Sequence, residues 1–407
     1  MGLRRDRLGC GAVVSGMNTA RAMRGVMMVV AAAGLAAGVA QGQPAAPAAS
    51  PAPGARADGA PVQASVTAER LIAHIKALPT SRAAWGDEAS KKGLRETETQ
   101  IVAKLKEMGY EPMLDLVDFL GARSGDVESM PEKPWHNIIV DIPGKTRPDE
   151  VLILSAHIDA VPGSPGADDD GTGVATVLEA ARVLKDAPMQ RTVRLIFFNL
   201  EEVGLVGSRA YVQRIKPDLN AKKYTILGMA SIDMIGYYSS EPNSQKSPIP
   251  AMGKFKPPTV GDFIGTAGIL AHRHFSQALD RAMHAAEPGE NGVKTVVVDF
   301  LPIAPPDLLR SDHAPFLAAG VPAVIMSDTA NFRSAHYHKP TDTIETLDAE
   351  RFAIGARSII GAYHALAGPV GGTLIDLKPP SSAAAKPDEP TDGPKKEPGA
   401  DAPGSKP

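Results

Sequence analysis

The stretch VLILSAHIDAVPGSPGADDD, residues 151–170, decides how the rest of this sequence can fold. It opens with an unbroken apolar run, VLILSA, which predicts a buried β-strand. A loop rich in proline and glycine follows, and the next segment, GVATVLEAARVL, has the apolar spacing of a helix. His157, Asp159 and three consecutive aspartates therefore lie where a strand ends and a helix begins. Open α/β sheets place their chemistry at such strand ends.

Similar strands and helices alternate along the rest of the chain. Further strands are expected from His136, Val193, Ile226, Val293 and Val321, and helices around residues 65–78, 94–108, 269–286 and 348–366. This alternation predicts an α/β fold in one domain, with a mostly parallel, twisted sheet flanked by helices on both faces.

The N-terminus is predicted to direct export. Arg21 and Arg24 precede an apolar run over residues 25–40 and a small-residue cleavage site, which is typical of a signal peptide. The alternative is a membrane anchor, but the run is shorter than the ~20 residues of a spanning helix. We expect a periplasmic or extracellular protein without a stable membrane anchor. The expected segments are a signal peptide (1–42), a disordered linker (43–64), the catalytic domain (65–368) and a disordered tail (369–407).

Composition excludes several classes of site. The formal net charge of -3 provides no basic surface for nucleic acid. Cys10 is the single cysteine of the 407 residues, which excludes an intrachain disulfide and a cysteine-rich zinc site. Any metal ligands must therefore be histidines and carboxylates.

Metal-type ligands follow several of the predicted strands. His157, Asp169, Glu202 and Asp233 lie at strand ends, and His338 lies in the late loop AHYHKPTDT. Imidazole and carboxylate ligands without sulfur suit a hydrolytic zinc or manganese site. The cluster is larger than one tetrahedral zinc requires, so we expect two metal ions bridged by a carboxylate.

Glu201 and Glu202 are adjacent at a strand end, so their side chains point to different sides. One can bind a metal while the other faces the substrate. A metal-activated water needs such a partner to accept its proton.

The motifs HIDAVPGSPGADDDGTG, NLEEVGLVGS, SIDMIGY, LLRSDHAPF and HYHKPTDT together resemble the M28 family of zinc metallopeptidases, over roughly residues 136–366. The resemblance implies the phosphorylase/hydrolase-like fold of zinc exopeptidases. It also implies two Zn²⁺ ions, a cis peptide between Asp169 and Asp170, and Glu201 as general base. One zinc would be held by His157, Asp169 and Asp233, and the other by Asp169, Glu202 and His338.

Other polar residues near these motifs are expected to support the site. Asp159 would orient His157 through its second ring nitrogen, and Asp170 would cap the following helix. His313, in SDHAPF, is expected to be structural rather than a ligand, with Asp312 as its hydrogen-bond partner. The loop 301–309 either lines an apolar substrate pocket or is a plain connection.

The predicted function is removal of N-terminal residues from peptides with a free N-terminus. Three alternatives remain open at this point. A glutaminyl cyclase shares the fold but typically uses one zinc. The M20 peptidases and deacylases have a motif like HIDAVP, but normally carry an inserted dimerisation domain. An inactive binding protein on the same scaffold is the third.

Overall fold

A computed structural model describes residues 60–117, 134–248, 251, 256–300 and 306–377. The chain divides into two units, 1–38 and 39–407, and every described residue belongs to the second. The predicted signal peptide, and most of the predicted linker and tail, lie outside the described residues. No helix of the described part has both the length and the apolar character needed to cross a membrane.

The described strands form one sheet in the order β1-β2-β4-β3-β5-β8-β6-β7. Their bounds are β1 Met113–Val117, β2 Trp135–Ile142, β3 Arg147–His157, β4 Arg191–Phe198, β5 Thr225–Ile232, β6 Ile264–Ile269, β7 Thr295–Phe300 and β8 Ala323–Ser327.

The centre of this sheet is parallel. β4, β3, β5 and β8 pair in parallel, whereas β2 joins β4, and β6 joins β8, in antiparallel pairs. The predicted α/β fold is confirmed, with a mixed sheet whose parallel part holds the organising strand β3.

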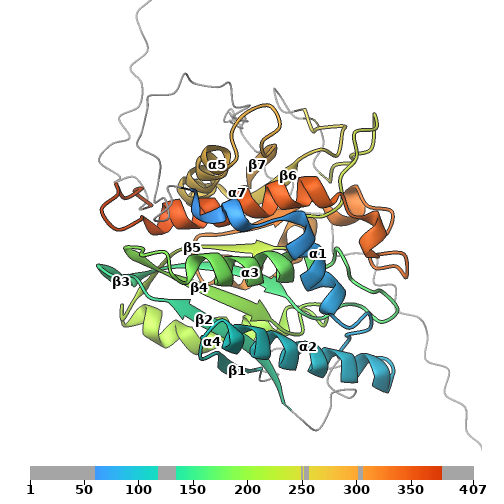
Figure 1. The fold of residues 1–407 in the computed structure, drawn as a ribbon, viewed down its shortest axis with the longest axis horizontal. Helices are drawn as coiled ribbons and strands as arrows, with labels where there is room; N and C mark the ends of the chain where they lie inside the picture. The colour runs from blue at the N-terminus through green and yellow to red at the C-terminus, as the bar shows by residue number, and fades with distance from the viewer. Residues whose placement is uncertain (1–59, 118–133, 249–250, 252–255, 301–305, 378–407) are drawn as a thin grey trace, which may run out of the picture. The chain divides into compact units, whose positions relative to one another are not determined.

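Helices cover both faces of the sheet (Figure 1). They are α1 Ala68–Ala77, α2 Glu88–Glu107, α3 Gly171–Leu184, α4 Val206–Asn220, α5 Arg273–Ala286, α6 His313–Ala318 and α7 Ala349–Ala367. Short 3₁₀ turns lie at η1 Val62–Ser65, η2 Leu270–His272, η3 Pro306–Leu309, η4 Ala330–Phe332 and η5 Ile344–Thr346. Apolar residues of α1, α3, α5 and α7 pack on one face, and those of α4 and α6 pack on the other.

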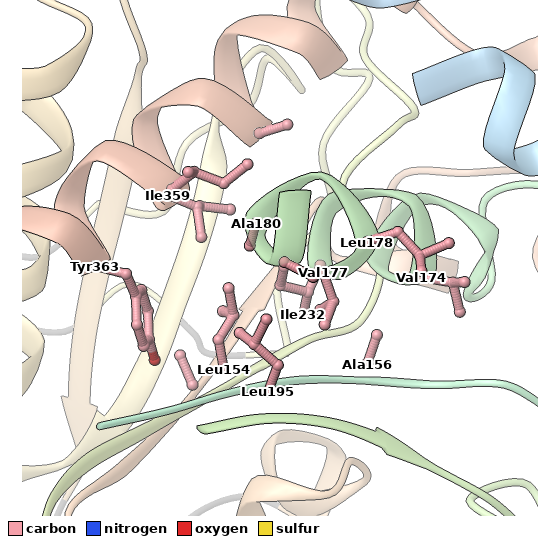
Figure 2. Packing of buried hydrophobic residues seen from close by; sticks show 14 of the residues in the cluster. Leu154, Ala156, Val174, Val177, Leu178, Ala180, Leu195, Ile232, Ile359 and Tyr363 are labelled. Atoms are coloured by element: carbon pink, nitrogen blue, oxygen red, sulfur yellow. The ribbon is translucent and has the colours of Figure 1, made fainter. Parts of the chain in front are cut away.

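The two cores explain why the run VLILSA is apolar throughout. Successive strand side chains point to opposite faces, so Leu152 and Leu154 join the core under α3, and Val151 and Ile153 join the core under α4. Figure 2 shows Leu154 beside the buried side of α3 and the ring of Tyr363 from α7. A strand buried on both faces needs apolar residues at every position.

Packed structure extends past both predicted ends of the catalytic domain. Val62, in η1, is buried, and Gln63 donates a hydrogen bond to the carbonyl of Ala286. Beyond residue 368, Leu377 is buried, and Arg191 donates to the carbonyl of Ile375. Residues 62–64 and 369–377 therefore belong to the folded part and not to the linker and the tail.

Four elements of the described structure have no counterpart among the predicted ones: β1, α4, β6 and α6. β6 contains Gly265 and Gly268, and glycine weakens a strand pattern. α4 contains Pro217, and it begins at Val206, inside the motif NLEEVGLVGS. β1 is a short strand at the edge of the sheet, with three exposed apolar residues.

Candidate metal centre

The residues predicted to bind metal come from neighbouring strand ends and two loops. β3, β4 and β5 run parallel, so their carboxyl ends lie at the same edge of the sheet. His157 ends β3, Glu202 follows β4, and Asp233 follows β5 directly. Asp169 stands just before α3, and His338 lies between β8 and α7. The fold brings all five side chains to one place.

Asp169 lies between the two histidines. Its Oδ1 is 3.1 Å from Nε2 of His157, and its Oδ2 is 3.2 Å from Nε2 of His338. Nε2 of His157 lies 4.0 Å from Oδ1 of Asp233, and Nε2 of His338 lies 3.2 Å from Oε1 of Glu202. Two ligand groups result, His157–Asp169–Asp233 and Asp169–Glu202–His338, each with its ligand atoms within 4.8 Å of one another. Asp169 belongs to both groups.

The ligand atoms of these two groups are suited to binding metal cations. Oε1 of Glu202 is buried, and although Nε2 of His338 lies 3.2 Å away, this oxygen has no well-aligned hydrogen-bond donor among the described residues. Burial and the charge of Asp169 raise the pKa of Glu202 to about 7, against the attraction of His338. Burial also raises the pKa of Asp233. Carboxylates packed this closely disfavour each other's ionised form unless a cation joins them, and imidazole with carboxylate is a usual zinc ligand set.

The ring of His338 also contacts a neighbouring aromatic ring. Tyr337 stacks on it with 3.8 Å between ring centroids and an interplanar angle of 20°. Arg310 in turn donates to the hydroxyl of Tyr337 at 2.7 Å. Burial works against protonation of His338, but Asp169 and Glu202 raise its pKa to about 10. The imidazole is therefore positioned by Tyr337 and attracted by the carboxylates of Asp169 and Glu202.

Glu201 lines a cavity together with the five predicted ligands, but it belongs to neither ligand group. Its side chain is buried, and burial raises its pKa well above the usual value. His157 opposes this shift, whereas Glu202 and Asp233 increase it. A carboxyl group in this setting can take up a proton and return it.

Asp159 contacts the second ring nitrogen of His157 through its backbone and not through its side chain. The carbonyl oxygen of Asp159, and not its carboxylate, lies 3.1 Å from Nδ1 of His157. Its Oδ1 is 3.7 Å from that nitrogen, too far for a hydrogen bond. The two carboxylate oxygens instead accept from the backbone N–H groups of Glu201 and Glu202, both at 3.1 Å. Asp159 thus orients the histidine by its backbone and the two glutamates by its side chain.

Asp170 caps α3, as the sequence predicts. Its Oδ1 accepts from the N–H of Gly173, and its Oδ2 accepts from the N–H of His157, both at 3.0 Å. The peptide bond between Asp169 and Asp170 is cis, as the resemblance implies, and so is the bond between Asp233 and Met234. The cap therefore ties the start of the helix to the end of β3.

Asp342 has a supporting role that the sequence analysis did not assign. Its two carboxylate oxygens accept from the N–H groups of Asp168 and Asp169, at 2.9 and 3.2 Å. Asp342 follows His338 by only four positions in the motif HYHKPTDT. This side chain therefore joins the His338 loop to the backbone of the shared aspartate.

His313 stands outside both ligand groups. Its Nε2 donates to the carbonyl of Leu308 at 2.9 Å, and burial lowers its pKa to about 4. Asp312 is buried near the site, and burial raises its pKa to about 7. Asp312 and His313 share no hydrogen bond in the described structure, so the predicted pairing is wrong, while the structural role of His313 agrees with its contacts.

A cavity of about 390 Å³ opens in front of the ligand groups. One side carries the polar site, and the rest is mainly apolar. Its apolar lining includes Phe263, Val296, Val298, Phe300, Leu308, Leu309, Ile325 and Phe332. Leu308 and Leu309 come from the loop predicted to line a pocket, whereas residues 301–305 lie outside the described residues.

The sequence of the site region matches the model of peptidase family M28 over residues 137–361. The chain belongs to peptidase family M28. Two relatives are similar to this chain in sequence. The uncharacterized protein YfbL of Escherichia coli is 30% identical over 236 residues, which are 54% of this chain and 68% of YfbL. Aminopeptidase YwaD of Bacillus subtilis is 30% identical over 239 residues, which are 56% of this chain and 44% of YwaD.

Solved structures share the fold of this M28 chain. A zinc aminopeptidase from Bacillus subtilis, BSAP, has a TM-score of 0.55 at 18% identity and covers 74% of this chain and 94% of its own. A glutaminyl cyclase from Fimbriiglobus ruber has a TM-score of 0.53 at 16% identity and covers 74% of this chain and 95% of its own. The predicted peptidase family and fold class are confirmed.

Proposed function

We propose that this chain is an exported aminopeptidase that uses two zinc ions. The observation that carries the proposal is the shared position of Asp169, whose two carboxylate oxygens each face one histidine of a separate ligand group. A carboxylate with one oxygen toward each group is the arrangement that a bridged pair of metal ions needs.

His157, Asp169 and Asp233 would hold one ion, and Asp169, Glu202 and His338 would hold the other. Two bound zinc ions supply polarisation of the scissile carbonyl and a more acidic water molecule. Manganese accepts similar oxygen and nitrogen ligands, but zinc is favoured by the named zinc aminopeptidase among the solved structures of this fold.

Glu201 would act as the general base. Its backbone is held by Asp159, and its carboxyl group lines the cavity without belonging to a ligand group. In the reaction it takes one proton from the attacking water and returns one proton to the leaving nitrogen. The C–N bond breaks, water adds across it, and Glu201 ends in its starting state.

The substrates would be peptides with a free N-terminus, and the apolar cavity wall favours an apolar first residue. The side chain of that residue removes apolar surface from water when it enters such a cavity. The relatives named as aminopeptidases agree with this substrate class.

Glutaminyl cyclization is the second candidate, because a glutaminyl cyclase shares the fold. Two complete ligand groups favour the two-metal peptidase, because the cyclase alternative calls for one zinc. An M20-type enzyme fits less well. Residues 264–327 supply β6, β7 and β8 to the single sheet, so the described part of this region is not a separate inserted domain.

Export is proposed from the sequence of residues 1–42 and from a relative named a probable lipoprotein aminopeptidase in Mycobacterium tuberculosis. N-terminal sequencing of the mature protein would test it, with cleavage near residue 42 as the expected result. An intact N-terminus on protein recovered from the cytoplasm would contradict export.

Metal analysis combined with a substrate panel tests the proposed activity. We expect two zinc equivalents per chain and hydrolysis of free aminoacyl arylamides, with no hydrolysis of N-blocked ones. One equivalent together with cyclization of N-terminal glutamine would support the cyclase instead. Hydrolysis of N-blocked substrates at the same rate would contradict an aminopeptidase.

A further inference from the structure

Arg82 is a buried arginine of the N-terminal segment that contacts the loop between His157 and Asp169. It stands in the segment that joins α1 to α2, outside the region matched by the family model, and it is 1% exposed. Nε donates to the carbonyl of Ile158 at 3.0 Å, and Nη2 donates to the carbonyl of Gly166 at 2.6 Å. Nη1 donates to the carbonyl of Pro165. One guanidinium thus connects the end of β3 to the loop that leads to Asp169.

The same loop is also held by Asp342. The carbonyl of Asp342 accepts from the N–H of Ala167, and its carboxylate accepts from the next two N–H groups, those of Asp168 and Asp169. Arg82 binds carbonyls of the loop and Asp342 binds amides. The backbone up to the shared aspartate is therefore fixed by two side chains that are far apart in the sequence.

Gly166 shows how closely Arg82 approaches this loop. Its φ is +62°, and a Cβ atom there would lie 2.7 Å from Nη2 of Arg82 and 2.4 Å from the carbonyl oxygen of Asp169. A side chain at this position would push the guanidinium away from the loop, so glycine is required by both the conformation and the contact.

Charge gives Arg82 a second link to the site. Burying a guanidinium is unfavourable unless acceptors and opposite charges surround it. The carboxylates of Asp342, Asp169, Asp170 and Asp159 all stabilise its charged form. Arg82 is buried and does not line the cavity, and it balances part of the negative charge that the zinc ions would meet there.

We propose that Arg82 is a positioning residue of the metal centre, which sets the place of Asp169 between the two ligand groups. The proposal rests on the proposed zinc site. It means that the segment before the family-matched region supplies part of the metal centre. A planar guanidinium can bind several carbonyls at fixed angles, which a lysine ammonium cannot reproduce.

The test is a zinc titration of the metal-free protein against a chelating dye, for the wild type and for Arg82→Met, Arg82→Lys and Arg191→Met. Arg191 is the matched control, because it is also buried and donates to the carbonyls of Leu366 and Ile375. It lies at the start of β4, away from the strand ends that carry the ligands. Circular dichroism selects the variants that are folded.

We expect Arg82→Met to weaken zinc binding about 10- to 100-fold, the usual effect of losing a group that orients ligands. Arg82→Lys should also weaken it, by a smaller factor, because it keeps the charge and loses the planar set of donors. Arg191→Met should lower the unfolding temperature and leave zinc affinity unchanged.

Wild-type zinc affinity in a folded Arg82→Met protein would overturn the inference. If Arg82→Met does not fold, wild-type affinity in Arg82→Lys overturns it instead. An equal loss in Arg191→Met would also overturn it, since general destabilisation would then explain the effect. If the wild type itself binds no zinc, the proposed function fails, which is distinct from all these outcomes.

Discussion

Nε2 of His338 lies 3.2 Å from Oδ2 of Asp169, although one residue comes from the loop after β8 and the other from the loop before α3. Oδ1 of the same aspartate faces His157. His338 is thus brought to the acidic groups only by the tertiary fold, and the proposed second ion depends on it.

His338→Ala is therefore expected to lose one zinc equivalent, because only Asp169 and Glu202 would remain in that group. His313→Ala is the control and should keep both equivalents, because His313 bonds to the carbonyl of Leu308 and belongs to neither group. Metal analysis after gel filtration checks this. The reverse pattern would show that the wrong histidine has been assigned.

Glu201→Gln should keep the fold and the metal content but lose most of the hydrolysis. The amide is close in size to the carboxyl group and cannot accept the proton, and general base catalysis contributes about 10²- to 10⁴-fold. Steady-state kinetics on a free aminoacyl arylamide measures the loss. Activity within a factor of two of the wild type would rule out Glu201 as the base.

Asp159→Asn tests the carboxylate that holds both glutamates. The side chain of asparagine keeps one acceptor oxygen and has an NH₂ donor in place of the other. It therefore cannot accept from both backbone N–H groups, and one of the bonds to Glu201 and Glu202 is lost. We expect kcat to fall about 10- to 100-fold with zinc content unchanged. Asp141→Asn, at the surface pair with Arg194, is the control. Loss of a zinc equivalent in Asp159→Asn would instead point to a direct effect on His157.

Gly265→Ala tests the role of the cavity in choosing the first residue. A Cβ at Gly265 would lie 3.4 Å from the carbonyl oxygen of Ser327, 3.5 Å from Thr329 and 3.7 Å from Phe263, so the variant should fold. All these residues line the cavity, and the methyl group would reduce its space. We expect kcat/KM for a phenylalanine arylamide to fall about tenfold relative to the alanine compound. An unchanged ratio would place the first side chain elsewhere.

Glu179→Gln tests an ion-pair network that joins α1 to α3. Glu179 is buried and contacts Arg70, His74 and Arg182. Burial would raise its pKa, but these partners lower it from 4.5 to about 2. A lowered pKa means that the folded state favours the ionised group. Its stabilising effect is therefore complete above pH 4.5 and is lost as the pH falls toward 2.

The variant should lose about 3 kcal/mol of unfolding free energy at pH 7, since breaking a buried pair leaves uncompensated charges. Urea unfolding at several pH values measures this difference, which should shrink below pH 4.5. Glu88→Gln, in an exposed pair with Lys91, should change nothing measurable. A difference that stays constant down to pH 3 would contradict the network as its source.

The ends of the central strands could be predicted from the sequence because the buried strands are apolar at nearly every position. His157, Glu202 and Asp233 stand out where such runs stop, since an unpaired polar group there is unfavourable. β6 was missed because its glycines interrupt the apolar pattern. Glycine contributes no side chain to an apolar run, and only pairing with β7 and β8 defines this strand.

The sequence by itself determined the family, the parallel centre of the sheet and the residues that gather at its edge, because these follow from local runs and motifs. Only the tertiary structure decided the contacts of Asp342, Arg82 and the carboxylate of Asp159. Each of these acts on backbone N–H or C=O groups of another segment. Every residue carries such groups, so no residue pattern shows which of them a distant side chain will bind.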